Sequence, residues 1–480
     1  MQETVFLEII NYLKKHAQYA DLRATDILHE SIAVKNLAID AISKSHDAGY
    51  GIRVLSGGSW GFASSPKFTP EAIKKTAAKA LELAKSSGSI NKKKIIFPAQ
   101  APVVDKHKTP CEIDPFEVPL DKKLDYLMWA CQTLKEHPSI KTAKSELDFY
   151  KTKKLFFNTE GSRIEQEIIE SGGYIEATAV LANEFQKRSY PTSHHNQLSQ
   201  AGYEYVKSLD LAGEAGRVRK EAVTLLRAKE LPYGETTLIL DGSQMALQIH
   251  ESCGHPVELD RALGEEESFA GTSFLTPDKL NKFRYGSKLV NIVADATAPG
   301  GLGTFGYDDE GTKAQRVDII KNGLFVGYLS SRETAAKINR ASGGAMRCGS
   351  WCMTPIIRMT NINLLPGDTT LEELISDTKN GIFMSTNKSW SIDDKRLNFQ
   401  FGCEIAWQIK KGKITEVYKN PLYAGITPRF WSSLSGIANK DYWKLYGIPN
   451  CAKGEPMQLM HVGHGTSPAR FEKVRVGRKR

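Results

Sequence analysis

The residue types with the clearest chemical meaning in this chain lie within one short stretch, residues 248–256. His250 and His255 supply imidazole nitrogens, which are good ligands for Zn²⁺. Glu251, directly after the first histidine, supplies a carboxylate that can take a proton from a zinc-bound water. The stretch therefore predicts a metal site with a base beside it.

The spacing of the two histidines constrains the backbone between them. They are five residues apart, whereas the familiar zinc-peptidase motif places its histidines four apart, one helical turn. At about 100° per residue, five steps place His255 about 140° from His250 on a regular helix. Because His255 precedes Pro256, it is biased away from the helical conformation, so we expect His250 on the last turn of a helix and His255 at its broken end. A π-bulge, which brings residues i and i+5 together, is the alternative.

The elements around this stretch divide the chain into two lobes near residue 230. Before that point, apolar residues recur at helical spacing in some segments and alternate in others. The expected helices span 3–15, 70–85, 120–136 and 202–230, and the expected strands span 20–26, 30–35, 37–45, 49–55, 140–150, 152–158 and 162–183. A strand at 236–241 then leads to the helix that reaches His250, with Ser243 as its expected N-cap.

From residue 287 onward, short apolar runs between Gly and Asp turns indicate a β-rich region. The predicted fold class is therefore α+β. A helix-on-sheet lobe is expected at 1–230, followed at 231–480 by a β-rich lobe that carries the metal site.

Composition sets limits on the class of protein. The chain has 480 residues, 41% of them hydrophobic, and lacks an apolar run of the ~20 residues that span a bilayer. Its seven cysteines are an odd number without framework spacing, and no secretory signal is visible, so we expect a cytoplasmic protein with reduced thiols. The net charge of +9 comes partly from a basic tail, but no nucleic-acid-binding motif accompanies it. Membrane and nucleic-acid partners are therefore not expected.

Two histidines do not complete a catalytic zinc site, which takes three protein ligands and leaves one position open. The other histidines, the cysteines and many carboxylates are all candidates, and sequence order does not choose among them. Cys253 is more typical of a packing residue than of a ligand. A cysteine nucleophile, Cys253 or Cys451 acting with His250, is an alternative chemistry. The glutamate after the first histidine is better explained by activation of water.

Further motifs accompany the His-Glu-x-x-x-His element, at 51–55, 60–63, 271–273, 308–311, 358–361 and 451–454. With these motifs the chain resembles, over nearly its whole length, the TldD/PmbA family of zinc metallopeptidases, whose members also carry the name modulator of DNA gyrase. The resemblance implies that His250, His255 and Cys451 hold Zn²⁺ and that Glu251 is the general base. Asn450 and Gly454 predict that Cys451 lies in a loop. His461 and His464, where the chain departs from the usual pattern, are alternative ligands.

The function implied by the resemblance is a zinc-dependent peptidase that hydrolyses short or unfolded peptides. The family also implies a homodimer or a heterodimer with a paralogue. Because some members lack the metal motif, the alternative is a non-hydrolytic peptide-binding or regulatory partner of a paralogous peptidase. A metal-dependent hydrolase of another amide or ester is a third possibility. Since the strands of the second lobe are short, we also expect an open sheet edge beside the metal, to which an extended peptide adds as a strand.

Overall fold

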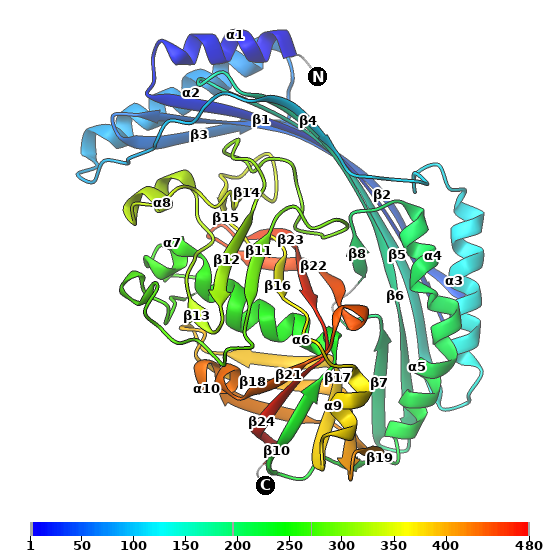
Figure 1. Cartoon of the computed structure of the whole chain (residues 1–480). Coiled ribbons are helices and arrows are strands. Elements are labelled where there is room, and N and C mark those ends of the chain that lie inside the picture. The colour runs from blue at the N-terminus through cyan, green and yellow to red at the C-terminus, as the bar shows by residue number, and fades with distance from the viewer. Residues whose placement is uncertain (1–2, 194–195, 270, 479–480) are drawn as a thin grey trace.

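The computed structural model describes residues 3–193, 196–269 and 271–478 (Figure 1). It contains 24% helix and 42% strand, which confirms the mixed class predicted from the sequence. The described residues form two eight-stranded sheets, one four-stranded sheet and two two-stranded sheets. None of the described helices combines the length and hydropathy needed to cross a membrane.

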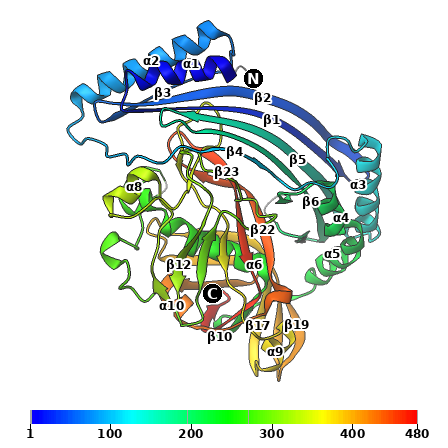
Figure 2. The same cartoon turned by 45° about the horizontal axis from the view of Figure 1, so that its top comes forward.

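The first sheet is built on four long antiparallel strands that curve around the rest of the molecule (Figures 1 and 2). They are β1 (Tyr19–Lys35), β2 (Ala38–Ser56), β5 (Ile140–Asn158) and β6 (Arg163–Leu181). Shorter strands pair along them: β3 (Ser59–Ser65), β4 (Val104–Lys108), β7 (Glu184–Tyr190) and β8 (Gln197–Ser199).

The expectation of separate short strands in this lobe is wrong at three places. Segments 20–26 and 30–35 form one strand, as do 37–45 with 49–55, and 140–150 with 152–158. The polar residues between the segments resemble strand breaks in the sequence. They lie instead within a continuous β1–β2 ladder that runs in register from Tyr19 opposite Leu55 to Ala33 opposite Ala41.

Helices cover the outer face of this sheet in two groups. One group is α1 (Glu3–Lys14) with α2 (Pro70–Ile90), and the other is α3 (Leu120–Lys135), α4 (Tyr203–Leu209) and α5 (Leu211–Leu225). The first group packs on Leu22 of β1, and the second packs on Ile32 of the same strand. Because these two residues are an even number of positions apart, their side chains lie on the same face of the sheet. The helix expected at 202–230 is interrupted at Asp210, which has left-handed backbone geometry (φ 48°).

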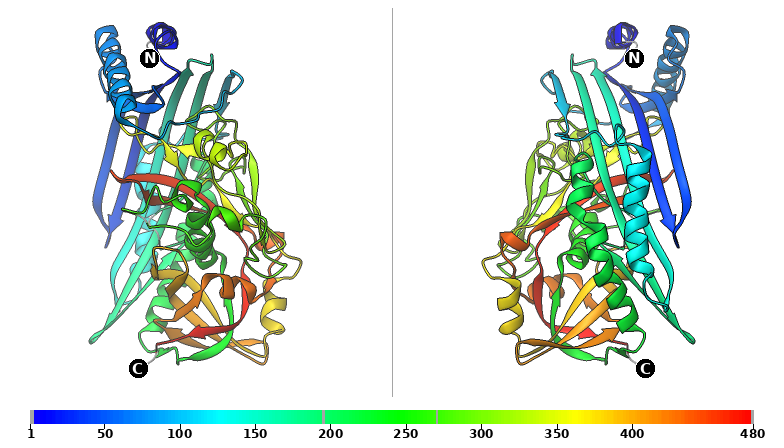
Figure 3. Two further views of the ribbon diagram at one scale, coloured as in Figure 1. Left: turned by 90° about the vertical axis from the view of Figure 1, so that its left-hand side faces the viewer. Right: turned by 90° about the vertical axis from the view of Figure 1, so that its right-hand side faces the viewer.

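The second lobe lies on the inner side of the curved sheet, and Figure 3 shows α3 and α5 on the opposite side. Its main sheet has the order β17-β10-β24-β20-β18-β19-β9. These strands are β9 (Lys229–Glu230), β10 (Gly234–Leu240), β17 (Asn380–Ile392), β18 (Asn398–Lys410), β19 (Lys413–Lys419), β20 (Leu422–Ile426) and β24 (Ala469–Val476). Residue 230, the predicted end of the first lobe, is the last residue of β9, so this short strand of the second sheet precedes the predicted boundary.

The remaining elements of the second lobe are short. The strands are β11 (Ile292–Asp295), β12 (Arg316–Lys321), β13 (Leu324–Phe325), β14 (Met346–Arg347), β15 (Ile356–Ile357), β16 (Ile362–Leu364), β21 (Leu434–Ile437), β22 (Lys444–Lys453) and β23 (Gln458–Thr466). The helices are α6 (Gly242–Ile249), α7 (Leu259–Ala262), α8 (Arg332–Lys337), α9 (Leu371–Ser376) and α10 (Thr427–Ser432). All residues of α6 are buried, and β22 and β23 pair as a separate two-stranded sheet.

A buried charge network joins the two lobes. Arg53 of β2 lies 2.8 Å from Asp21 and 3.3 Å from Glu310 of the second lobe. Glu310 also accepts a hydrogen bond of 2.8 Å from the backbone N–H of Arg332, and Trp60 packs its ring 4.3 Å from the Arg53 guanidinium. The motifs at 51–55, 60–63 and 308–311 therefore connect the lobes.

Candidate metal centre

The metal motif begins at the end of α6, which connects β10 to the centre of the second lobe (Figure 1). The N-cap of α6 is Asp241, whose side chain accepts from the backbone N–H of Gln244. The expectation that Ser243 caps this helix is wrong, because Asp241 precedes it and the Ser243 hydroxyl donates to the Asp241 carboxylate at 2.8 Å. Because α6 is buried along its whole length, its C-terminal end, and with it His250, lies in the interior of the lobe.

Residues His250–Gly254 form a π-helix, and His255–Val257 continue as a 3₁₀ turn. The backbone N–H of His255 donates to the carbonyl of His250, the i+5 bond that defines a π turn. The two imidazole rings consequently lie 4.8 Å apart at 89°. The π-helix, the alternative named above, is therefore present, and the expectation that the helix breaks at His255 is wrong. Pro256 does not break the helix because it occupies the first turn of the 3₁₀ segment, where no backbone N–H is required.

Side chains from the surrounding core support the π turn. Tyr285 donates its hydroxyl to the Ser252 carbonyl, and Trp431 donates its indole N–H to the Ser252 hydroxyl at 2.9 Å. Gly254 is in contact with Met359, whose sulfur would lie 2.4 Å from an added Cβ. A side chain at 254 therefore requires displacement of the neighbouring core.

Cys451 approaches the two histidines from β22, and not from a loop as the sequence suggested. Between Ile448 and Cys451 the pairing with β23 shifts, since Ile448 pairs with Val462 and Cys451 with Met460. Three steps along β22 thus match two along β23, which is the geometry of a β-bulge, a device that changes the direction of a side chain. The candidate ligand atoms of His250, His255 and Cys451 all lie within 4.8 Å of one another.

Each histidine of the cluster uses its Nδ1 atom for a hydrogen bond to another side chain. His250 Nδ1 lies 2.8 Å from His464 Nε2, and His255 Nδ1 lies 3.0 Å from the Glu258 carboxylate. His464 Nδ1 in turn faces the Ile362 carbonyl at 3.3 Å, so its N–H is needed there and its Nε2 accepts from His250. The Nε2 atoms of His250 and His255 remain available as ligands.

Glu258 belongs to a network of charges that are fully buried or nearly so. Its carboxylate lies 3.4 Å from Arg261 and 3.5 Å from Lys453. The Lys453 ammonium also lies 2.8 Å from Asp260 and donates to the Ile357 carbonyl at 2.7 Å. Because Lys453 follows Cys451 on β22, this network links the strand of the cysteine to the turn of the histidines.

Local electrostatics favour the zinc-binding form of Cys451 and His255. Burial alone raises the pKa of the Cys451 thiol, but Arg358, His250 and His255 together hold that pKa well below its ordinary value. Burial also lowers the pKa of His255 well below its usual range, which favours the neutral imidazole. For His250, burial lowers the pKa, but the neighbouring Cys451 thiolate offsets this and the pKa is raised, so a metal ion that binds there displaces a proton. Two imidazole nitrogens and a thiolate, with Cys451 only 3% exposed, form a donor set that fits Zn²⁺ with one open position.

Glu251 lies beside the cluster and is 5% exposed. Its Oε2 atom accepts from Arg396 Nη1 at 2.5 Å, whereas Oε1 accepts no hydrogen bond from any residue that the structure describes. Arg396 lies in the turn between β17 and β18, and sequence reasoning did not identify it. No local pattern marks it, because its partner lies 145 residues earlier in the chain.

The alternative ligands lie outside the three-residue cluster. His461 bonds to Glu170 of the first lobe at 2.8 Å, and His464 supports His250 through a ring nitrogen. Cys253 is fully buried, and burial raises its pKa to about 12, as expected for a packing residue.

A segment of three consecutive glutamates, 265–267, contacts the strand of Cys451 through Glu266, whose carboxylate accepts a hydrogen bond from the backbone N–H of Gly454.

Sequence reasoning also missed Glu258 and the hydrogen-bonding role of Arg358. Glu258 follows His255 by three residues, which is a detectable spacing for a carboxylate that supports a ligand. Arg358 donates to the carbonyls of Cys451 and Gln458 and so holds the β22–β23 hairpin against the core. Its motif was visible in the sequence, but its partners were not.

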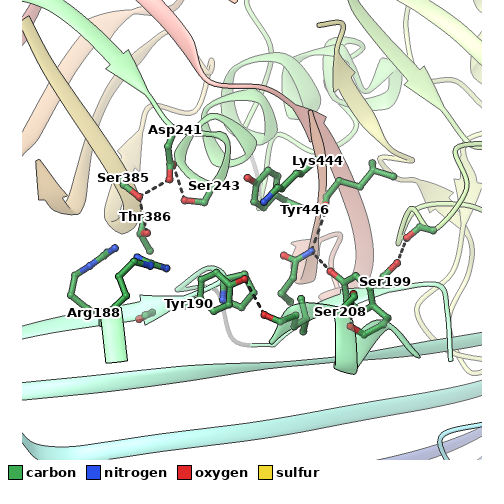
Figure 4. A pocket seen from close by; sticks show the side chains of 18 of the residues that line it. Arg188, Tyr190, Ser199, Ser208, Asp241, Ser243, Ser385, Thr386, Lys444 and Tyr446 are labelled. Carbon is green, nitrogen blue, oxygen red and sulfur yellow. Dashed lines mark hydrogen bonds between the residues drawn. The ribbon is translucent and has the colours of Figure 1, made fainter. Parts of the chain in front are cut away.

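A cavity of about 620 Å³ lies between the two lobes at the opposite end of α6 from the metal centre (Figure 4). Figure 4 shows Asp241 and Ser243 on one side of it and Tyr190 and Ser208 on the other. None of the three cluster residues lines this cavity. It is therefore separate from the metal centre.

Comparison with known proteins identifies relatives over nearly the whole chain. A model of the PmbA/TldA metallopeptidase C-terminal domain matches residues 233–478, and a model of PmbA/TldA metallopeptidase domain 1 matches residues 20–84. A metalloprotease of Methanocaldococcus jannaschii is 33% identical over 463 residues, which cover 96% of this chain and 97% of that protein. A zinc metalloprotease TldD homolog of Saccharolobus solfataricus is 25% identical, over 98% of this chain and 99% of its own.

Solved structures share the whole fold. A candidate modulator of a DNA gyrase from Thermotoga maritima superposes with a TM-score of 0.78 at 17% identity, over 99% of this chain and 100% of the other. TldE from Thermococcus kodakarensis gives a TM-score of 0.77 at 16% identity, with the same coverage. The chain belongs to the TldD/PmbA family of metallopeptidases.

Proposed function

We propose that this protein is a zinc-dependent peptidase that hydrolyses short or unfolded peptides. The observation that carries the proposal is the buried cluster of His250, His255 and Cys451, with Glu251 directly beside it. When bound there, Zn²⁺ supplies a Lewis acid that polarises the scissile carbonyl and lowers the pKa of water.

In this proposal Glu251 is the general base. Its Oε1 atom accepts a proton from the attacking water and later returns it to the leaving amine as the C–N bond breaks. The products are a carboxylic acid and an amine, and no oxidant or reductant is needed. Arg396, through its 2.5 Å contact with Oε2, holds the Glu251 carboxylate in place during both transfers.

An extended main chain is the substrate form that this site favours. The hairpin that carries Cys451 forms a two-stranded sheet whose edges are already used in part, since Gly463 of β23 bridges to Asn361 and Arg358 donates to the Cys451 carbonyl. In this proposal a peptide adds to the edge groups that remain and gains affinity from its backbone, which requires an unfolded segment and little side-chain preference. We therefore propose that the chain cleaves flexible peptides and spares folded domains.

The test compares Glu251→Gln with wild-type protein, both loaded with zinc, on a set of disordered peptides read by mass spectrometry. We expect Glu251→Gln to keep the fold and about one zinc per chain but to lose turnover by several orders of magnitude. His250→Ala is the matched variant that should lose the metal as well.

Activity of Glu251→Gln within tenfold of wild type would show that Glu251 is not the base. Wild-type protein that binds zinc and peptides without cutting them would favour the non-hydrolytic partner. Cleavage of simple esters or other amides, but of no peptide, would favour a different hydrolase. A stable globular protein incubated in parallel tests the requirement for an unfolded substrate.

A further inference from the structure

The cavity between the lobes adjoins two elements that carry metal ligands (Figure 4). Asp241 and Ser243 lie in its wall at the start of α6, and α6 leads to His250. Tyr446 lies in the wall near the start of β22, and β22 leads to Cys451. A molecule bound in the cavity therefore contacts the beginning of both elements.

These two beginnings also touch each other. A Cβ atom added to Gly242 of α6 would lie 2.4 Å from the hydroxyl oxygen of Tyr446. Tyr446 is partly exposed, and its hydroxyl forms no hydrogen bond with any residue that the structure describes. The hydroxyl is therefore available to a ligand at the point where α6 and β22 meet.

Two charged groups in the wall have no charged partner. Asp241 is the single carboxylate among the described residues that line the cavity, and it forms no ion pair with any of them. Lys444 is exposed on β22 and also forms no ion pair within the described part of the chain. The cavity thus offers one unpaired negative group and one unpaired positive group.

The other two cations of the wall are already neutralised by carboxylates outside it. Arg188 lies 2.8 Å from both Glu221 and Glu404. Arg217 lies 3.2 Å from Glu221 and packs 5.4 Å from the ring of Tyr190. These arginines shape the wall but leave the charge of a ligand to Asp241 and Lys444.

Asp241 retains room for one further donor. Its carboxylate accepts from the Ser243 hydroxyl at 2.8 Å, the Gln244 backbone N–H at 2.9 Å and the Ser385 hydroxyl at 2.5 Å. A carboxylate has about four acceptor positions, so one remains. An ammonium group, which carries donors and a positive charge, matches that position.

The rest of the wall has two features of a ligand site. Phe383 and Trp407 stack with ring centroids 5.4 Å apart, which provides an apolar surface. Thr386 is buried in the wall with a φ of 59°. A β-branched residue rarely adopts this left-handed conformation, and residues held in it are concentrated at active sites and ligand sites.

The strand geometry sets the length of a ligand that reaches both charges. Lys444 and Tyr446 are two residues apart on β22, which places them about 6.6–6.8 Å apart along the strand. Tyr446 in turn contacts Gly242, the residue after Asp241. Two extended peptide residues span at most about 6.6–7.2 Å, so a ligand of two or three residues matches this separation.

We propose that this cavity binds a peptide of two or three residues with free ends, and that the bound peptide raises the zinc affinity of the metal centre. The ammonium of the peptide pairs with Asp241, its carboxylate pairs with Lys444, and an apolar side chain packs on Phe383 and Trp407. A ligand with one charged end would leave one of the two groups unpaired. The inference rests on the charges of the cavity and does not depend on the proposed peptidase activity.

The first test is calorimetric titration of the full-length protein with phenylalanyl-leucine after removal of zinc by a chelator. Without zinc, neither cleavage nor binding to the metal contributes to the signal, so the result is independent of the proposed function. We expect saturable binding of one peptide per chain.

Two variants that each remove one charge locate the peptide. Asp241→Asn remains a good N-cap for α6, and Lys444→Met keeps the length of the side chain. Each should weaken binding at least about tenfold, because each removes a hydrogen bond between charged groups. Asp441→Asn and Lys440→Met, at exposed positions outside the wall, are the matched controls and should bind like wild type.

Changes to the peptide identify which end meets which residue. N-acetylation should weaken binding to wild-type protein at least about tenfold but have little further effect in Asp241→Asn. A C-terminal amide should do the same in wild type but have little further effect in Lys444→Met. Such non-additivity is expected only for groups in direct contact.

The effect on zinc is measured by competition with a chromophoric chelator, in Glu251→Gln protein so that the peptide stays intact. Saturating phenylalanyl-leucine should raise zinc affinity at least about threefold, because it holds the beginnings of α6 and β22 together. By linkage, zinc should raise the affinity for the peptide by the same factor. Added Asp241→Asn should abolish the effect, which separates it from peptide bound directly at the metal.

Three outcomes overturn the inference. The first is no binding of the peptide to zinc-free protein. The second is binding that neither charge removal weakens, which would place the peptide elsewhere. The third is a zinc affinity that the peptide does not raise. Circular dichroism establishes that each variant is folded, and the acetylated and amidated peptides test both contacts on wild-type protein as well.

Discussion

The two histidines of the metal centre are held by chemically different surroundings. His250 bonds to a second imidazole, His464, which in turn bonds to a backbone carbonyl. His255 bonds to the Glu258 carboxylate, which lies in a buried network with Arg261 and Lys453. One ligand is therefore supported by a chain of hydrogen bonds through a second imidazole, and the other by several coupled charges.

The difference indicates where stability and metal affinity are concentrated. Removing one member of a buried charge network leaves its partners unpaired in a medium that solvates them poorly, which is costly. Removing a neutral hydrogen-bond partner costs less, because no charge is left uncompensated. Substitutions among the partners of His255 should therefore lower both the stability of the protein and its affinity for metal. Substitutions among the partners of His250 should lower mainly the affinity for metal.

The largest effect is expected at Lys453, which contacts both Glu258 and Asp260. Lys453→Met keeps the length of the side chain but leaves these two carboxylates without their ammonium partner. We expect the free energy of unfolding of the metal-free protein to fall by about 3–5 kcal/mol, measured by urea denaturation. Lys444→Met, at an exposed position of the same strand, should change it by less than about 0.5 kcal/mol. Equal stabilities for the two variants would contradict the role of the network.

An intermediate effect is expected at Glu258. Glu258→Gln keeps an oxygen that can accept from His255 but removes the negative charge. Partners that orient a metal ligand typically contribute about 10–100-fold to metal affinity, and we expect a loss within that range. Competition with a chromophoric zinc chelator measures it. Wild-type affinity in this variant would show that the charge on Glu258 does not support His255.

A smaller effect is expected at His464. His464→Phe keeps an aromatic ring but removes the nitrogen that accepts from His250, so the correct tautomer of His250 is no longer fixed. We expect zinc affinity to fall about tenfold, at the lower end of the range for such partners, with a smaller loss of stability than in Lys453→Met. His464→Gln, which offers an oxygen acceptor, should recover part of the affinity. A loss greater than that of Glu258→Gln would reverse the comparison.

The smallest effect concerns the coupling of the two sides. His464 bonds to His250 and Glu258 bonds to His255, so the two supporting side chains act on different ligands. The stability losses of His464→Phe and Glu258→Gln in the metal-free protein should therefore add to within about 0.5 kcal/mol in the double variant. A larger deviation would show that the two sides are coupled through the buried core.

The sequence supported several elements because their signals are local. Helices at 70–85 and 120–136 were visible from apolar spacing, and the structure contains α2 and α3 there. The lengths of β1 and β2 were not predictable, because polar residues at their centres look like turns unless the facing strand is known. The loop predicted at Cys451 was wrong for a related reason, since Asn450 and Gly454 accompany a bulge and a hairpin.

The residue types of the metal motif, and the five-residue spacing that requires an unusual turn, are visible in the sequence alone. Two backbone solutions to that spacing could also be named from the sequence, and the π-helix is the one present. The partners that surround the motif could not be predicted, because they depend on how distant segments pack. His250 and His464 are 214 residues apart, and Glu251 and Arg396 are 145 apart. Helical and strand periodicity arise from bonds between near neighbours, whereas these contacts exist only after the hairpin and the β17–β18 turn have packed against α6.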